Sequence, residues 1–159
     1  MGKRLTAKGV KPICPYHHKY ESTYLFGAFS PVTGNAFMLD LPFCNAATFQ
    51  LFLNEFAMEQ PSELKIMFLD NGAFHKANKL KIPDNIVLVF LPPYSPELNP
   101  AEKVWWVLKR EINLQVFKTM NELQMYLDKV IKKAITEENI IQLISYQYYI
   151  ESFQTVVVA

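Results

Sequence analysis

Two acidic side chains stand at positions where a carboxylate could bind a metal ion. Asp70 directly follows the apolar run Ile66 to Leu69, which places it at the end of an expected strand and before an Asn-Gly turn. Glu102 lies in the first turn of a helix that is expected after the next apolar run, Ile86 to Leu91. Carboxylate oxygens of this kind are ligands for hard cations such as magnesium. If the two runs are neighbouring strands, both acids lie at the same edge of a sheet and can converge.

Each acid also has a purely structural interpretation. An aspartate in the position of Asp70 can start the following turn or cap a short helix. Glu102 stands three residues after Asn99, so the two fit a capping box, in which the glutamate reaches back to the backbone of the cap. The spacing alone leaves both roles open for both acids.

The first half of the chain predicts the elements that lead to Asp70. Two aromatic and apolar runs, Tyr24 to Ser30 and Asn35 to Leu41, flank residues 31–34 (PVTG), which favour a turn and predict a β-hairpin. Apolar residues then recur at helical spacing from Asn45, a suitable N-cap, up to Pro61. We therefore expect an amphipathic helix that packs on the sheet.

The two apolar runs beside the acids are continuous and are bounded by turn formers. Residues 66–69 and 86–91 therefore predict central, parallel strands that are covered on both faces. A short basic helix is expected over Phe74 to Leu80, and residues 92–96 (PPYSP) predict a stiff, extended connection.

Two helices are predicted in the second half. Asn99 is expected to cap the first, with Pro100 at its first helical position and Val104, Leu108 and Ile112 facing inward. The second has an apolar stripe formed by Leu123, Leu127, Val130, Ile131 and Ala134. Residues after Ile140 show no clear period. The order hairpin, helix, strand, strand, helix, helix predicts a layered α/β domain.

Two segments resemble the signature of mariner-type bacterial insertion-sequence transposases, whose catalytic unit is a DDE superfamily endonuclease domain. They are residues 68–72 (FLDNG) and, above all, residues 91–105 (LPPYSPELNPAEKVW). A weaker likeness extends from Gly9 to Phe117. The resemblance implies a ribonuclease-H-like fold, a mixed sheet flanked by helices, and DNA cleavage and strand transfer at transposon ends.

The resemblance also implies three acids that hold two divalent ions, usually Mg²⁺ and alternatively Mn²⁺. Asp70 matches the second acid and Glu102 the third, with 32 positions between them (70 to 102). No residue matches the first acid, because Asp40 and Glu21 lie on the wrong elements. We therefore expect an N-terminally truncated domain that lacks the first strand and is inactive alone.

The expected organisation is a basic extended arm over residues 1–20, the truncated catalytic domain over 21–145 and a C-terminal tail over 146–159. A complementing upstream transposase fragment could supply the missing acid, and an exposed strand edge favours a homodimer. The alternative is a non-catalytic remnant or regulator that binds DNA or a transposase.

Contacts to DNA, as transposon ends and target, are expected from basic side chains. The candidates are Lys3, Arg4, Lys11, His75, Lys76, Lys103, Lys109 and Arg110. A solvated surface explains such charges equally well. His75 could instead position a metal ligand, or be ordinary polar surface.

Trp105 and Trp106 are adjacent on the helix that contains Glu102, so their side chains point about 100° apart and cannot both face the core. We expect Trp105 to be the core residue and Trp106 to be available to DNA or a partner.

The remaining features of the sequence concern the cellular compartment in which the protein is expected. Cys14 and Cys44 are too few for a disulfide framework and predict reduced, partly buried thiols. Cys14, His17 and His18 fit no standard zinc spacing. No apolar run has the roughly 20 residues of a membrane helix. We expect a cytoplasmic, nucleoid-associated protein with no membrane partner.

Overall fold

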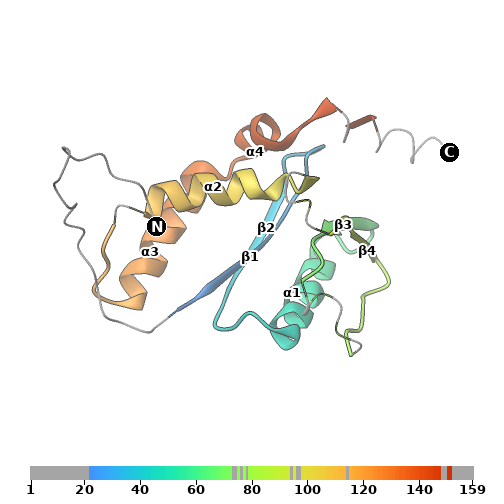
Figure 1. Cartoon of the computed structure of the whole chain (residues 1–159), viewed down its shortest axis with the longest axis horizontal. Coiled ribbons are helices and arrows are strands. Elements are labelled where there is room, and N and C mark those ends of the chain that lie inside the picture. The colour runs from blue at the N-terminus through green and yellow to red at the C-terminus, as the bar shows by residue number, and fades with distance from the viewer. Residues whose placement is uncertain are drawn as a thin grey trace.

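A computed structural model describes residues 22–72, 75, 77, 79–93, 95, 98–113, 115–147 and 150–151. These residues form a mixed α/β structure with four strands and four helices. In chain order they are β1 (Tyr24–Phe29), β2 (Ala36–Leu41), α1 (Ala46–Met58), β3 (Lys65–Leu69), β4 (Ile86–Phe90), α2 (Ala101–Ile112), α3 (Met120–Ala134) and α4 (Glu137–Ile144) (Figure 1). The predicted α/β class is confirmed.

The predicted hairpin is formed by β1 and β2. The two strands pair antiparallel, with Phe26 opposite Leu39. Gly34 ends the connecting turn with a φ of 78°, a conformation that favours glycine because it has no Cβ. Successive side chains of a strand point to opposite faces, so the hairpin presents one apolar surface on each side.

Helix α1 covers one face of the hairpin and also the second pair of strands. It begins with a complete capping box: the Asn45 side chain accepts a hydrogen bond from the Thr48 N–H, and the Thr48 hydroxyl oxygen accepts one from the Asn45 N–H. Its buried face joins residues of all four strands in a first core, built on Leu41, Phe49, Phe52, Leu53, Leu69 and Ile86. The two pairs of strands are therefore held together through α1.

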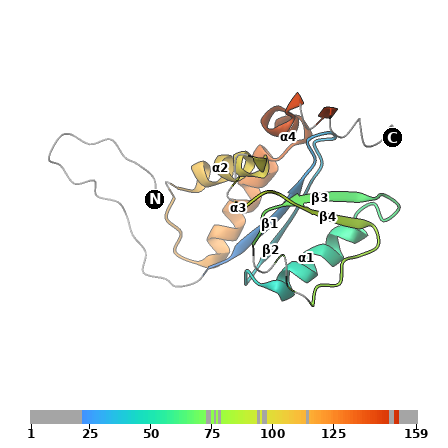
Figure 2. The same ribbon diagram turned by 45° about the vertical axis from the view of Figure 1, so that its right-hand side comes forward.

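The opposite face of the hairpin is covered by α2, α3 and α4 (Figure 2). The buried members of this second core are Val104, Leu108, Val130, Ile140 and Ile144. Phe29 of β1 packs edge-on against Trp105 of α2, with 5.3 Å between the ring centroids. Trp105 is thus part of the core and Trp106 is exposed, as the sequence predicts.

Strands β3 and β4 pair in parallel, as predicted, with Ile66 opposite Val87. The expectation that they are covered on both faces is wrong, because Ile66, Phe68 and Val87 are exposed while their neighbours contact α1. The described strands also form two separate two-stranded sheets and not one mixed sheet. The continuous apolar sequence of β3 and β4 suggests burial on both faces, but among the described residues only one face of the strand pair packs against another element.

Smaller differences concern the ends of helices. Helix α2 begins at Ala101, with Pro100 as its cap residue, although the Asn99 side chain still accepts a hydrogen bond from the Ala101 N–H at 3.1 Å. The basic helix expected over 74–80 lies partly outside the described residues, and those described there form turns. Helix α4, which the sequence analysis did not predict, is capped by Thr136.

Cys44 is a free thiol, as predicted, but the prediction that it is partly buried is wrong, because it is exposed in the loop between β2 and α1. The basic arm, with Cys14, His17 and His18, and Glu21 lie outside the described residues. Within the described ranges, no helix is long and apolar enough to cross a membrane.

Candidate metal site between a strand end and a helix start

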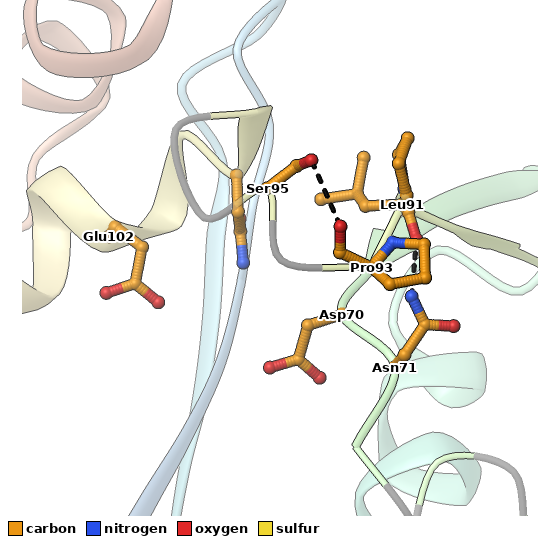
Figure 3. Close-up of a pocket in the computed structure, with 8 residues that line it drawn as sticks. Asp70, Asn71, Leu91, Pro93, Ser95 and Glu102 are labelled. Atoms are coloured by element: carbon orange, nitrogen blue, oxygen red, sulfur yellow. Dashed lines mark hydrogen bonds between the residues drawn. The ribbon is translucent and has the colours of Figure 1, made fainter.

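A cavity of about 400 Å³ lies where β3 ends and α2 begins. Its lining comes from the end of β3, from the connection after β4 and from the start of α2: Asp70, Asn71, Leu91, Pro92, Pro93, Ser95, Asn99 and Glu102. Asp70 and Glu102 extend from facing sides of this space (Figure 3). The structure therefore brings together the two acids that the sequence analysis selected.

Asp70 is placed by the pairing of the two parallel strands. The backbone N–H of Leu91 donates to the carbonyl of Leu69 at 2.9 Å, which extends the pairing to the residue before the acid. The Asn71 side chain also donates to the Leu91 carbonyl and ties the two strand ends together. The Asp70 side chain is 69% exposed, so its carboxylate can be reached from the solvent.

One oxygen of the Asp70 carboxylate is held by the turn that follows. Oδ1 accepts a hydrogen bond from the Gly72 N–H at 3.0 Å, so the turn-starting role is confirmed. The same oxygen lies 2.9 Å from Nδ1 of His75. A Cβ on Gly72 would lie 3.1 Å from both atoms, so a larger residue here would crowd this contact. The second oxygen, Oδ2, accepts no hydrogen bond from the described residues, which makes it the ligand candidate.

His75 is not ordinary surface, since its side chain is only 14% exposed. Its ring packs on Phe49 of α1, with 4.6 Å between centroids. Together with the contact to Asp70, this fixes the ring between the first core and the carboxylate. The arrangement fits a residue that orients a metal ligand.

Glu102 is exposed in the first turn of α2. The capping-box interpretation is wrong, because the Glu102 carboxylate accepts no hydrogen bond from the Asn99 N–H or from any other described group, although the Asn99 side chain accepts one from the Ala101 N–H. Within the described residues, a cation at Glu102 would therefore have no hydrogen bond to displace.

The donor set fits a hard divalent cation only in part. Carboxylate oxygens are suitable ligands, and Asp70 and Glu102 line the same cavity. In the part of the chain that the structure describes, no group of three or more His, Cys, Asp or Glu side chains could hold a metal. Asp40, the nearest alternative acid, is engaged elsewhere: it accepts hydrogen bonds from Thr23 and Gln124.

Of the residues predicted to contact DNA, His75 is largely buried against Asp70 and Phe49, and the others divide into two groups. Lys103, Lys109 and Arg110 are exposed on the same helix as Glu102. Four others lie outside the described residues: Lys3, Arg4, Lys11 and Lys76. Sequence reasoning missed Asn71, whose bond to Leu91 closes the strand ends, although its Asn-Gly pair already marked a turn at this place.

Comparison with known proteins identifies the family of the chain. A family described as "DDE superfamily endonuclease" matches residues 2–124, which include both acids. The chain is 38% identical over 102 residues to the uncharacterised protein y4pE/y4sA of Sinorhizobium fredii (strain NBRC 101917 / NGR234), covering 63% of this chain and 76% of the relative. A domain of this superfamily implies DNA as substrate, transposase-type cleavage and, in general, divalent metals. The chain belongs to the DDE superfamily of endonucleases.

Proposed function

We propose that this chain provides the catalytic domain of a mariner-type insertion-sequence transposase, which cleaves DNA and transfers strands at transposon ends. Asp70 and Glu102 are the proposed catalytic residues and Mg²⁺ or Mn²⁺ the ion. The observation that supports this most directly is that the two acids line one cavity at the carboxyl end of a parallel strand pair. Active sites of open α/β sheets gather at this edge.

The proposal extends to the fold and its limits. We propose that the hairpin and the parallel pair are two parts of one ribonuclease-H-like mixed sheet, since α1 already packs across both. The catalytic domain then spans residues 21–145, between the basic arm (1–20) and the C-terminal tail (146–159). A further strand would join the two sheets and bring a third acid to the cavity.

The missing first acid of the triad is proposed to come from polypeptide other than the described residues, either a complementing transposase fragment or a second copy in a homodimer. Asp70 and Glu102 would hold divalent ions that, when bound with a complete set of ligands, would supply activation of water or a 3′-hydroxyl and stabilisation of the leaving oxygen. Two carboxylates give too few ligands for that arrangement. The chain alone is therefore expected to bind a cation weakly and to leave DNA uncut.

The residues of the chain have separate tasks in this mechanism. Asp70, fixed through Oδ1 by Gly72 and His75, offers its other oxygen in a set direction. Glu102 supplies a second ligand from the opposite wall. The positive face of α2 and the basic arm bind phosphates and align the backbone with the cavity.

Metal titration tests the site directly. We expect Asp70→Asn and Glu102→Gln each to weaken Mn²⁺ binding, measured by isothermal titration calorimetry, by roughly 10-fold or more, because each removes a charged ligand. Asp84→Asn is the matched control, since Asp84 is exposed at the opposite, amino end of β4. Equal Mn²⁺ affinity in all four proteins would overturn the metal site.

Cleavage of transposon-end DNA tests whether the first acid of the triad is missing from this chain. The chain alone is expected to show no Mg²⁺- or Mn²⁺-dependent nicking, and an added acid-bearing fragment is expected to restore it. Robust cleavage by the chain alone that is abolished by Asp70→Ala would show that the set of ligands is already complete.

A second candidate function is a non-catalytic remnant or regulator that binds DNA or a transposase. It is favoured by the lack of a third acid beside Asp70 and Glu102 within the described ranges. It predicts salt-sensitive DNA binding that is unchanged in Asp70→Ala and Glu102→Ala. Loss of metal-dependent DNA binding in either variant would favour the transposase over the regulator. Cleavage that is restored by an added acid-bearing fragment would do the same.

A further inference from the structure

Trp106 is a large aromatic side chain that is 61% exposed beside the proposed metal site. It stands four residues, about one helical turn, after Glu102 and four before Arg110, so the three share one face of α2. The core role of a tryptophan in this helix is already filled by Trp105, which packs on Phe29. The position of Trp106 therefore has no explanation in the packing of the domain.

A second hollow, of about 380 Å³, lies next to this ring, between α2 and α4. It is lined by Glu102, Lys103, Trp106 and Leu143, so Trp106 and Leu143 make its walls apolar. Glu102 lines both this hollow and the cavity that contains Asp70. The two hollows are thus neighbours that share Glu102 as a lining residue.

Positive charge surrounds the apolar walls. The Arg110 guanidinium lies 4.9 Å from the centroid of the Trp106 ring, and the Lys103 ammonium lies 4.4 Å from that of Tyr146. Lys109 is exposed on the same helix. An apolar slot with an aromatic wall and cationic rims matches a nucleotide, whose base stacks while its phosphates contact lysine and arginine.

We propose that the Trp106 hollow is a stacking site for one unpaired nucleobase of the bound DNA, adjacent to the phosphate that is cut. This inference rests on the proposed function, because it assigns DNA as the ligand of the neighbouring cavity. A paired base is shielded by its neighbours in the duplex, whereas an unpaired one offers its face to the indole. The chain should therefore prefer DNA ends that carry a short single-stranded overhang over blunt ends.

Fluorescence anisotropy in EDTA, with the full chain and labelled duplexes with and without an overhang, measures this preference without the metal. We expect Trp106→Ala to weaken binding of the overhang duplex roughly 5- to 100-fold and to leave blunt-duplex binding nearly unchanged. Trp106→Phe should keep most of the preference, because it retains a stacking face. Phe43→Ala is the matched control, since Phe43 is 62% exposed in the loop before α1.

A 2-aminopurine in the overhang gives a second readout, because its fluorescence is quenched when it stacks. Quenching by the wild-type chain and its loss in Trp106→Leu support the site. No overhang preference in the wild type, or an equal preference in Trp106→Ala, overturns it.

The two failures are distinguishable. If Mn²⁺ binding depends on Asp70 and Glu102 but Trp106→Ala behaves like the wild type, only the stacking site is wrong. If Trp106 determines overhang binding while Asp70→Asn leaves Mn²⁺ affinity unchanged, the metal site is wrong and the stacking site stands. Circular dichroism of each variant verifies that the fold is kept.

Discussion

The two acids of the candidate site differ in how firmly their side chains are held in one orientation. Asp70 is held by the Gly72 N–H and by His75, so its orientation is set before any ion arrives. Glu102 has no such restraint among the described residues and keeps its rotamer freedom. Ordering a glutamate side chain costs up to about 1.5–2 kcal/mol, which a cation must offset. Asp70 is therefore the anchor of the site and Glu102 the adaptable ligand.

Replacing His75 tests this anchoring. His75→Ala removes the contact with Asp70 Oδ1 and the packing on Phe49, so we expect Mn²⁺ affinity to fall, roughly 10-fold, as is usual when a residue that orients a ligand is lost. Isothermal titration calorimetry gives the affinity and thermal melting gives the stability.

His75→Phe separates the two contributions, because it keeps a ring against Phe49 and removes the nitrogen that contacts Asp70. We expect its stability to stay near that of the wild type and its Mn²⁺ affinity to stay low. Full affinity in His75→Phe would show that the histidine serves packing alone.

Most elements could be predicted because their signals are local. Asn45 caps α1 through its own side chain, and the alternating hairpin strands flank a turn that needs Gly34. The convergence of Asp70 and Glu102 followed from the rule that parallel strands end at one sheet edge. Helix α4 was missed because its eight residues include only two fully buried side chains, Ile140 and Ile144, too few for a clear period.

Other features depend on tertiary structure and could not be predicted. The apolar composition of β3 and β4 indicates burial but not which partner covers each face, and Phe68 is exposed. The contact between His75 and Asp70 depends on the path of the loop. Asn99 was expected to cap α2 directly, yet Pro100 is already close to helical geometry at a φ of −64°, so the boundary moved by one residue.

The turn of the hairpin is fitted against the start of α4. A Cβ on Gly34 would lie 2.4 Å from the Glu137 carbonyl oxygen, and the φ of 78° is unfavourable for other residues. We expect Gly34→Ala to lower the free energy of unfolding by roughly 2 kcal/mol or more, as judged by the midpoint of urea denaturation.

Asn35→Ala, in the same turn, is the matched control, since this side chain is exposed and the change should stay within about 0.5 kcal/mol. A Gly34→Ala midpoint equal to that of the wild type would mean that α4 moves away from the turn at little cost.

At the scale of the whole molecule, an apolar surface is left open on the parallel strand pair. Ile66, Phe68 and Val87 form it, and Phe68 is 52% exposed. Open strand edges and apolar faces of this kind favour association. This surface supports the proposal that the chain completes its sheet with a second polypeptide.

Sedimentation velocity over a range of concentrations tests the role of this surface. We expect the wild-type chain to self-associate and Phe68→Ser to shift the equilibrium toward monomer, with little change in the free energy of unfolding because the side chain is exposed. Met67→Ser is the matched control on the opposite face of β3: Met67 packs on the first core, so its loss should lower stability instead. A wild-type chain that is monomeric at all concentrations would contradict the prediction.

The hairpin packs against both cores, one on each face. Each of the two acids lies close in sequence to a residue of a different core. Asp70 follows Leu69, which belongs to the core around α1, while Glu102 lies two residues before Val104, which belongs to the core around α2. A cation bound by both would act as a reversible cross-link between the two halves. Its affinity is thermodynamically linked to the integrity of both, because opening either core separates the ligands. Substitutions in either core, far from the cavity, can thus change the affinity for the metal although they contact neither the metal nor its ligands.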